Sequence, residues 1–308
     1  MHGNVIWGNG NEDELKGVSH LRRYFEGWYF KQQNSLETVA LIPAVHADNC
    51  GRKKATIQAV TSDGAYCYDV PDGAFTYRRK PLEIHAGKCF FNEKKILLDA
   101  QSDNCNLLGE LSLGTFGSLK YDIMGPFQLF PFMECRHTVL SMMHDVVGVI
   151  QINGKEYHFD HHLGYIEGDR GRSFPNRYIW TQCTWLENEP CSLMISLADI
   201  PYMGMSFTGV IAVVLINDRE YRLATYLGAK PILISKDQII VKQGAYTLSA
   251  QRLDQGGMLL KAPVMGGMTR MIHEAPACRV MYRLIKGDRV LLDTIQDQAG
   301  YEYEYSSE

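Results

Sequence analysis

The stretch that decides the fold is Val146-Val147-Gly148-Val149-Ile150-Gln151-Ile152-Asn153-Gly154-Lys155-Glu156-Tyr157-His158-Phe159. β-branched and aromatic residues fill both flanks, and such side chains fit the pleated, half-buried surface of a strand. Asn153-Gly154 is typical of a two-residue hairpin turn, because both central residues of that turn need a positive φ. The stretch therefore predicts two antiparallel strands, residues 146–152 and 155–159, joined by a tight turn.

The same arrangement of two short strands around a polar turn recurs along the chain. Further pairs are residues 55–61 and 65–70 around Ser62-Asp63-Gly64, 210–216 and 219–225 around Asn217-Asp218, and 281–286 and 289–295 around Gly287-Asp288. Short strands separated by regular turn signals predict an all-β barrel or sandwich with few short helices. Residues 191–200 fit either a strand or a helix.

Two of these hairpins resemble each other in sequence, at residues 146–157 and 210–221. The likeness is either a coincidence, since apolar strands around an Asn turn are common, or a trace of duplication with similar β-units in each half. The length of 308 residues exceeds the usual size of one domain. We expect an N-terminal domain at 1–160 and a C-terminal domain at 161–308, divided where the strand pattern breaks at Asp160-His161-His162.

Composition and charge describe an ordinary globular protein. Hydrophobic residues make up 45% of the chain, charged residues 21%, and the formal net charge is −4. Without a basic field, nucleic acid is not an expected partner. The longest apolar run, residues 210–216, is too short to cross a bilayer, and residues 1–4 do not resemble the start of a secretory signal. We expect no transmembrane segment and leave a transient contact with a membrane surface open.

Cysteine usage indicates the compartment. Eight cysteines are scattered with no Cys-x-x-Cys pair, and a chain of this length needs no disulfide framework. Free thiols in a reducing environment are therefore expected, and the predicted localisation is cytoplasmic.

Two segments place carboxylates among large aromatic side chains. They are Tyr24-Phe25-Glu26-Gly27-Trp28-Tyr29-Phe30-Lys31 and the block from Gly164-Tyr165-Ile166-Glu167-Gly168-Asp169-Arg170 to Tyr178-Ile179-Trp180-Thr181-Gln182. An ionised carboxylate is poorly hydrated in such surroundings, so its protonated form gains weight and it becomes a candidate acid. Glu26, Glu167 and Asp169 are the candidate catalytic residues. The alternative is that both segments are well-packed strands, because strands are rich in aromatic residues.

These segments also carry a family resemblance. The first resembles a Phe-Phe-Glu-Gly-Trp-Tyr-Phe-type motif of tocopherol cyclases, and the second is similar to their Glu-Lys-Asn-Trp-Gly…Phe-Pro…Trp-x-Trp-x-Gln block. Supporting matches follow in the same order at Pro131-Phe132-Met133-Glu134, Leu260-Lys261-Ala262-Pro263 and Ala277-Cys278-Arg279. The resemblance implies two tandem lipocalin-like antiparallel β-barrels, as in the related carotenoid hydratases.

The resemblance also implies an activity. Tocopherol cyclases protonate an isoprenoid double bond and close a ring, which needs a neutral acid, aromatic faces for a cationic transition state and exclusion of water. We therefore expect acid-catalysed cyclisation, isomerisation or hydration of an isoprenoid or other apolar small molecule in a barrel cavity. The alternative is a non-catalytic carrier of a hydrophobic ligand.

Strand alternation predicts which side chains share that cavity. Alternate residues of a strand share a face, so one side should carry Tyr24, Glu26, Trp28 and Phe30. Tyr178, Trp180 and Gln182 should lie together on another strand, and both sets would then bind the ligand. The alternative is that Trp28 and Trp180 plug the barrel ends. The other ligand-binding candidates, in the segments that carry the resemblance, are Glu134, Tyr165, Arg170 and Phe174.

Gly168 and Arg170 depart from the family pattern, which has Lys and Trp at these positions. Loss of an indole removes a π-face, and a guanidinium repels a developing carbocation, so the departure predicts a different reaction or substrate. We expect Arg170 to pair with Glu167 or Asp169 and to anchor a carboxylate, phosphate or quinone oxygen. The alternative is an exposed arginine in a loop.

No metal and no organic cofactor is expected. His158, Asp160, His161 and His162 have ligand chemistry, but alternation places His161 on the other face, and a site needs complete geometry. His46, His137 and His144 are predicted to be hydrogen-bonded structural histidines. The chain has no Gly-x-Ser-x-Gly elbow, phosphate-binding loop or dinucleotide fingerprint, which argues against a serine hydrolase, a phosphotransferase and a nicotinamide enzyme.

Overall fold

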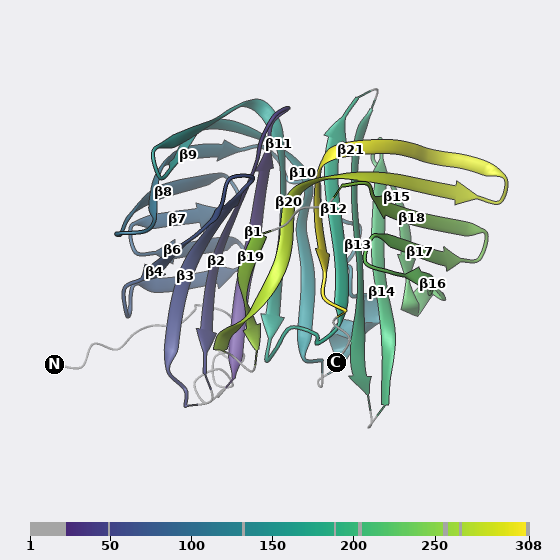
Figure 1. Ribbon diagram of the computed structural model, residues 1–308, viewed down its shortest axis with the longest axis horizontal. Helices are drawn as coiled ribbons and strands as arrows, with labels where there is room; N and C mark the ends of the chain where they lie inside the picture. The colour runs from purple at the N-terminus through teal and green to yellow at the C-terminus, as the bar shows by residue number, and fades with distance from the viewer. Residues whose placement is uncertain are drawn as a thin grey trace.

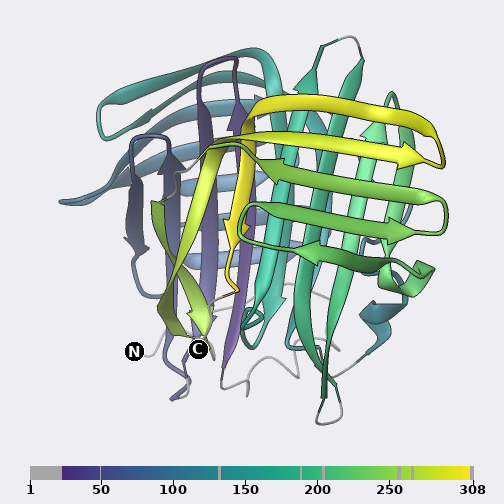
Figure 2. The ribbon, with the colours of Figure 1, turned by 45° about the vertical axis from the view of Figure 1, so that its right-hand side comes forward.

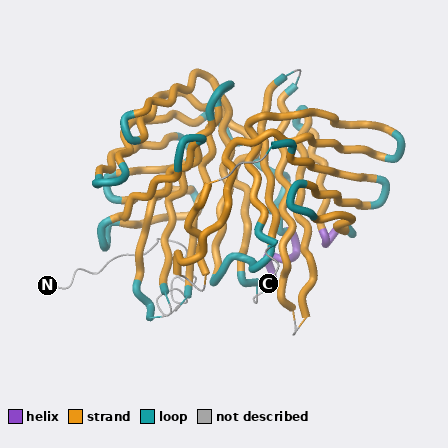
Figure 3. Tube along the Cα trace, viewed as in Figure 1, coloured by secondary structure: helices purple, strands orange, loops and turns teal. Residues whose placement is uncertain are grey.

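Two β-barrels lie side by side in the computed structural model of the chain (Figure 1). The structure describes residues 23–48, 50–130, 133–187, 189–202, 205–254, 258–264 and 267–305. Residues 1–4, Pro131 and Phe132, discussed above, lie outside these ranges. Within them the regular structure is β-strand apart from the short 3-10 helices η1 (Gly125–Leu129) and η2 (Thr225–Leu227), as Figure 3 shows. The all-β prediction is confirmed, and none of the described helices could cross a membrane.

The first sheet has eleven antiparallel strands in the order β4-β3-β2-β1-β11-β10-β9-β8-β7-β6-β5. The last strand pairs with the first, so the sheet curls into a barrel with its seam between β4 and β5. Its strands are β1 (Tyr24–Gln33), β2 (Thr38–Ala47), β3 (Lys53–Thr61), β4 (Ala65–Val70), β5 (Phe75–Arg79), β6 (Leu82–Ala86), β7 (Cys89–Asn92), β8 (Lys95–Gln101), β9 (Asn106–Leu113), β10 (Cys135–Ile152) and β11 (Lys155–Gly171).

The second sheet repeats this topology in the order β15-β14-β13-β12-β21-β20-β18-β17-β16, with β19 also on β20. Here β21 returns to pair with β12, and the seam lies between β15 and β16. Its strands are β12 (Tyr178–Leu186), β13 (Pro190–Tyr202), β14 (Met205–Ile216), β15 (Arg219–Ala224), β16 (Lys230–Ile234), β17 (Gln238–Gln243), β18 (Tyr246–Arg252), β19 (Met258–Val264), β20 (Gly267–Lys286) and β21 (Arg289–Tyr303). The chain thus forms two tandem lipocalin-like barrels, and the ambiguous residues 191–200 lie in a strand.

The two similar hairpins form as predicted but are not equivalent. Both turns use positive φ, at Asn153-Gly154 and at Asn217-Asp218. The first turn joins the last two strands of its sheet, β10 and β11, whereas the second joins the third and fourth strands, β14 and β15. In the shared topology β15 corresponds to β4, so the duplication interpretation of this sequence likeness is wrong.

The break in the strand pattern at residues 160–162 is a bulge inside β11. Val146 pairs with His162 and Gly148 pairs with Phe159, so two residues of β11 oppose Val147 alone. His161 adopts a φ of 52° there. A bulge interrupts the alternation of side chains without ending the strand. The chain passes from the first sheet to the second at residues 172–177, between β11 and β12.

Burial patterns show where the barrels meet. Along β8 buried and less buried residues alternate, as expected for a strand with one face toward solvent. By contrast β2 and β12 are buried along nearly their whole length, because one face packs inside the barrel and the other against the neighbouring barrel. Figure 2 shows strands of the two barrels running side by side where the barrels meet. Each barrel has its own core, and a third hydrophobic cluster fills the contact between them.

Candidate functional site

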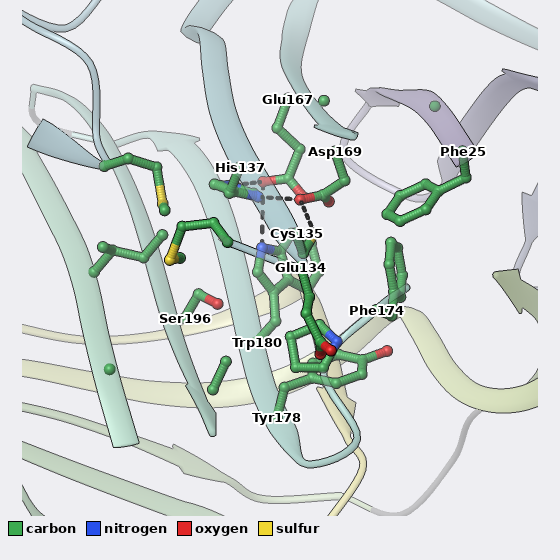
Figure 4. A pocket seen from close by; sticks show the side chains of 18 of the residues that line it. Phe25, Glu134, Cys135, His137, Glu167, Asp169, Phe174, Tyr178, Trp180 and Ser196 are labelled. Carbon is green, nitrogen blue, oxygen red and sulfur yellow. Dashed lines mark hydrogen bonds and ion pairs between the residues drawn. The ribbon is translucent and has the colours of Figure 1, made fainter. Parts of the chain in front are cut away.

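A cavity of about 180 Å³ lies between the two barrels (Figure 4). Strands β1, β2, β10 and β11 of the first barrel and β12, β13 and β14 of the second form most of its wall, and η1 adds Phe127. The sequence predicts a cavity inside a barrel, whereas this cavity lies between the two barrels. Trp28 and Phe30 belong to the core of the first barrel, and Trp185 and Tyr282 to that of the second.

A histidine between two carboxylates lies at one end of the cavity. His137 Nδ1 is 3.0 Å from Asp169 Oδ1, and His137 Nε2 is 3.3 Å from Glu167 Oε2. His137 on β10 and Asp169 on β11 are cross-strand partners, and Glu167 lies two residues away on the same face of β11. Strand register therefore brings the three side chains together (Figure 4).

Further donors hold the carboxylates in place. Glu167 Oε2 accepts hydrogen bonds from Tyr165 Oη at 2.5 Å and from Trp180 Nε1 at 3.2 Å. Cys135 Sγ donates to Asp169 Oδ1 at 3.5 Å. Trp180 comes from β12 of the second barrel, so the site is complete only when the two barrels are in contact.

Burial and neighbouring charges shift the pKa of His137 in opposite directions. Burial by itself lowers the pKa of His137, but the charges of Asp169 and Glu167 outweigh it and hold that pKa well above its ordinary value. Burial, followed by the charge of Glu167, raises the pKa of Tyr165 well above its ordinary value. Burial, followed by the charge of Asp169, does the same for the pKa of the Cys135 thiol. At neutral pH the cluster therefore holds an imidazolium between two acids.

Aromatic rings form the wall beside this cluster. Tyr29 packs edge-on against Trp180 with ring centroids 5.6 Å apart, and Phe25 packs against Phe174 at 5.1 Å. Phe174 in turn meets Tyr178 at 6.1 Å. Such rings offer both an apolar surface and π-faces to a bound molecule.

The structure brings most residues of the second motif to the cavity. Tyr165 lies behind Glu167 rather than in the wall. The predicted site residues in the wall are Glu134, Glu167, Asp169, Phe174, Tyr178 and Trp180.

The residues of the first motif that line the cavity are those on the strand face opposite to the predicted one. Phe25, Gly27 and Tyr29 line the cavity, whereas Tyr24, Glu26 and Trp28 lie on the other face of β1, inside the first barrel. The predicted alternation of side chains along β1 is correct. The face of β1 that lines the cavity, however, is the one turned toward the second barrel. Trp28 is a core residue packed edge-on against Tyr77, as the structural alternative proposed.

Glu26 is engaged in a buried ion pair. Arg79 Nε lies 2.7 Å from Glu26 Oε1 and Arg79 Nη2 lies 2.8 Å from Glu26 Oε2, and Tyr24 also donates to Oε2. Both carboxylate oxygens are therefore occupied by donors, and this cluster lies inside the barrel, away from the cavity wall. The arrangement does not support the predicted role of Glu26 as a catalytic acid.

Gln182 and Arg170 also lie away from the cavity wall. Gln182 is buried between the barrels, where it accepts a hydrogen bond from Lys31 Nζ at 3.1 Å. Arg170 lies on the face of β11 that turns toward Trp28, and it makes no ion pair among the described residues. Gly168, which has no side chain, is itself part of the cavity wall. The expected pairing with Glu167 or Asp169 is wrong, because residues one apart on a strand point to opposite faces.

The histidines near the bulge do not converge. His158 contacts Glu156, His161 contacts Asp145, and His162 Nδ1 accepts from the backbone of Asp160. Among the described residues, the group that could hold a metal ion is instead His137, Glu167 and Asp169, whose ligand atoms lie within 4.8 Å of one another.

His137 is the residue that sequence reasoning missed as a functional one. It follows the Met133-Glu134 segment by three positions and shares a strand face with Cys135. Its relation to Asp169 depends on the register of a long hairpin with several irregularities. The residue types alone gave no signal that separates it from His144, which is also buried.

One solved structure supports this architecture. A crystal structure of a protein assigned as AttH, from Nitrosomonas europaea, is similar with a TM-score of 0.53 and 10% identity, covering 99% of this chain and 100% of that one. A protein of unknown function from the DUF3598 family of Nostoc punctiforme has 10% identity and a TM-score of 0.17, over 93% and 97% of the two chains, and supports no argument. No curated protein sequence matches significantly.

The family model for tocopherol cyclase-like proteins matches residues 111–303. The match includes β10, β11 and β12, which supply His137, Glu167, Asp169 and Trp180. It covers more than half of the chain, and the chain therefore belongs to the tocopherol cyclase-like family.

Proposed function

We propose that this protein is an enzyme that protonates an apolar, isoprenoid-like small molecule in the cavity between its barrels, and so promotes cyclisation, isomerisation or hydration. The observation that carries the proposal is the His137–Glu167–Asp169 cluster at one end of a mainly apolar, aromatic cavity. Buried titratable groups with strongly shifted pKa values in such a cavity are typical of catalytic sites.

Each member of the cluster has a separate role in this proposal. Asp169 delivers the proton to the ligand, because it lines the cavity and its Oδ2 accepts no hydrogen bond from the described residues. It receives that proton at Oδ1 from the His137 imidazolium, whose Nδ1 lies 3.0 Å away. His137 is a positioning residue that holds this proton in the resting protein and becomes a neutral imidazole when Asp169 passes the proton on. Glu167, held by Tyr165 and Trp180, keeps the imidazolium in place.

The aromatic wall of the cavity can stabilise the carbocation that protonation forms. Trp180 and Tyr29 present π-faces, which attract a carbocation. The mainly apolar lining offers water few hydrogen-bond partners, which slows trapping of the cation by solvent. A quinol hydroxyl or a water molecule would close the reaction as the nucleophile, and the proton that it loses would return through Asp169 to His137.

The test uses a geranylgeranylated benzoquinol in deuterated water with the purified protein. Turnover should place one deuterium on the carbon that is protonated, as read by mass spectrometry. Asp169→Asn should reduce the rate by about a hundredfold or more, the usual contribution of general acid catalysis. His158→Gln, a change at an exposed histidine of the same strand, is the matched control and should keep the rate.

Saturable binding of the quinol without any deuterated product would decide for the alternative, a carrier of hydrophobic ligands. The same binding in wild type and in Asp169→Asn would support that result, because a carrier needs the cavity but not the acid.

A further inference from the structure

The charged groups in the cavity wall are almost all acidic. His137 is the basic residue among them, and the described lining includes no lysine and no arginine. The carboxylates in the wall are Glu134, Glu167, Asp169, Asp199 and Glu302.

These carboxylates lie along the cavity rather than at one point. Glu167 and Asp169 are at the His137 end (Figure 4). Glu302 accepts a hydrogen bond from Tyr178 at 2.7 Å. Glu134 and Pro201 are exposed, so they mark the side on which the cavity meets solvent.

The cavity is richer in acceptors than in donors. Glu167 receives its hydrogen bonds on Oε2 and Asp169 on Oδ1, so Oε1 and Oδ2 have no hydrogen-bond donor among the described residues. The donors in the wall are already used in part, since Trp180 donates to Glu167 and Tyr178 to Glu302. A molecule that displaces water from these acceptors loses their hydrogen bonds unless it carries a donor of its own.

The excess of acceptors over donors in the wall determines which ligand charge the cavity favours. A carboxylate or phosphate that entered the cavity would lose hydration and lie beside like charges. The basic residue in the wall is His137, which two acids already pair, and Arg177 outside the wall pairs with Asp199 at 3.6 Å. A protonated amine would gain charge-assisted hydrogen bonds from the same carboxylates. A neutral hydroxyl donates but gains less, so it should rank between the two.

We propose that the cavity selects apolar molecules whose polar end is a hydrogen-bond donor without negative charge, above all a protonated amine, and that it rejects molecules ending in a carboxylate or phosphate. The proposal rests on the proposed function, because it names the ligand class of the same cavity. It replaces the expectation that Arg170 anchors an anionic group.

The experiment compares three twelve-carbon probes that differ at one end: dodecylamine, dodecanol and dodecanoate. Binding to the full chain is measured at neutral pH and below micelle formation, by quenching of the tryptophan fluorescence that Trp180→Phe removes. We expect dodecylamine to bind about tenfold or more tightly than dodecanoate, a difference of about 1.4 kcal/mol, with dodecanol between them.

Equal or tighter binding of dodecanoate would overturn the inference while leaving the apolar cavity and the proposed function in place. Failure of all three probes to quench Trp180 would overturn both, since the cavity would then not bind apolar molecules.

A matched pair of variants assigns the preference to the cavity rather than to overall charge. Glu134→Gln removes a charge at the exposed end of the cavity, and Glu189→Gln removes one from the exposed hairpin between β12 and β13. Glu134→Gln should reduce the ratio of amine to carboxylate affinity severalfold, whereas Glu189→Gln should leave it unchanged. The same ratio in both variants would show that net charge sets the preference, and would overturn the inference.

Discussion

His137 on β10 and Asp169 on β11 are directly opposed across the hairpin, and His137 Nδ1 lies 3.0 Å from Asp169 Oδ1. Glu167, two residues before Asp169 on the same face of β11, has its Oε2 3.3 Å from His137 Nε2. A single imidazole thus bridges two acids at the end of an apolar cavity, and the chemistry proposed here depends on that arrangement.

His137 should stay protonated across neutral pH, because the two carboxylates hold its pKa well above its ordinary value. Proton and nitrogen NMR of labelled protein should show an imidazolium at pH 7. His144 is the internal control: burial lowers its pKa to about 3, so it should remain neutral in the same spectrum. A neutral His137 ring at pH 7 would contradict the arrangement.

Asp169→Asn should move the titration of His137 to lower pH, because one of the two negative charges beside the ring is lost. Tyr165→Phe is the milder comparison: it removes a hydrogen bond to Glu167 but no charge at neutral pH. An equal shift in both variants would show that hydrogen bonding, and not charge, sets the state of His137.

His144 should destabilise the fold in acid. Its ordinary pKa is 6.5 and its folded-state pKa is about 3, so between these values the unfolded chain takes up a proton that the folded chain does not. Stability should therefore fall as the pH falls from 6.5 toward 3, by at most about 1.4 kcal/mol per pH unit from this residue. Urea unfolding of wild type and His144→Leu over this range measures the difference in slope, and His158→Leu, at an exposed position, should keep the wild-type slope.

An apolar ligand should quench Trp180 and not Trp28. Trp180 lines the cavity and donates to Glu167, whereas Trp28 is packed in the core of the first barrel. Titration with dodecanol should show quenching in Trp28→Phe and lose most of it in Trp180→Phe. The reverse result would place the ligand inside the first barrel, as the sequence pattern of β1 had predicted.

Arg79→Met should destabilise the protein by about 3–5 kcal/mol, because it leaves the buried Glu26 without its cation. Arg78→Met is the matched control, since the neighbouring Arg78–Glu83 pair is exposed and should contribute less than about 1 kcal/mol. Ligand affinity should be unchanged in both, which denaturant unfolding and the fluorescence titration measure together. Loss of ligand binding in Arg79→Met with folding intact would show that the Glu26 cluster belongs to a binding site.

Local sequence determined the strands and most turns of this protein. Asn153-Gly154 predicts its hairpin because few residues adopt the two positive φ values of that turn. The strand β12 is likewise visible as aromatic and β-branched residues from Tyr178 to Trp185, although Thr181, Gln182 and Thr184 are polar and yet buried. Such signals depend on neighbours in the chain, so they can be predicted without the fold.

The site itself was decided by tertiary structure. Counted outward from Asn153-Gly154, an unbroken ladder would place His137 opposite Arg170, but the irregularities in the β10–β11 pairing shift the register by one residue and place it opposite Asp169. A slip of one residue exchanges the two faces of a strand. Which face of β1 and β11 meets the cavity was set in the same way by the second barrel, which packs against one face and supplies Trp180. Neither the net shift across several bulges nor the docking of one barrel on another is recorded in any short stretch of sequence, because both arise from contacts between residues far apart in the chain.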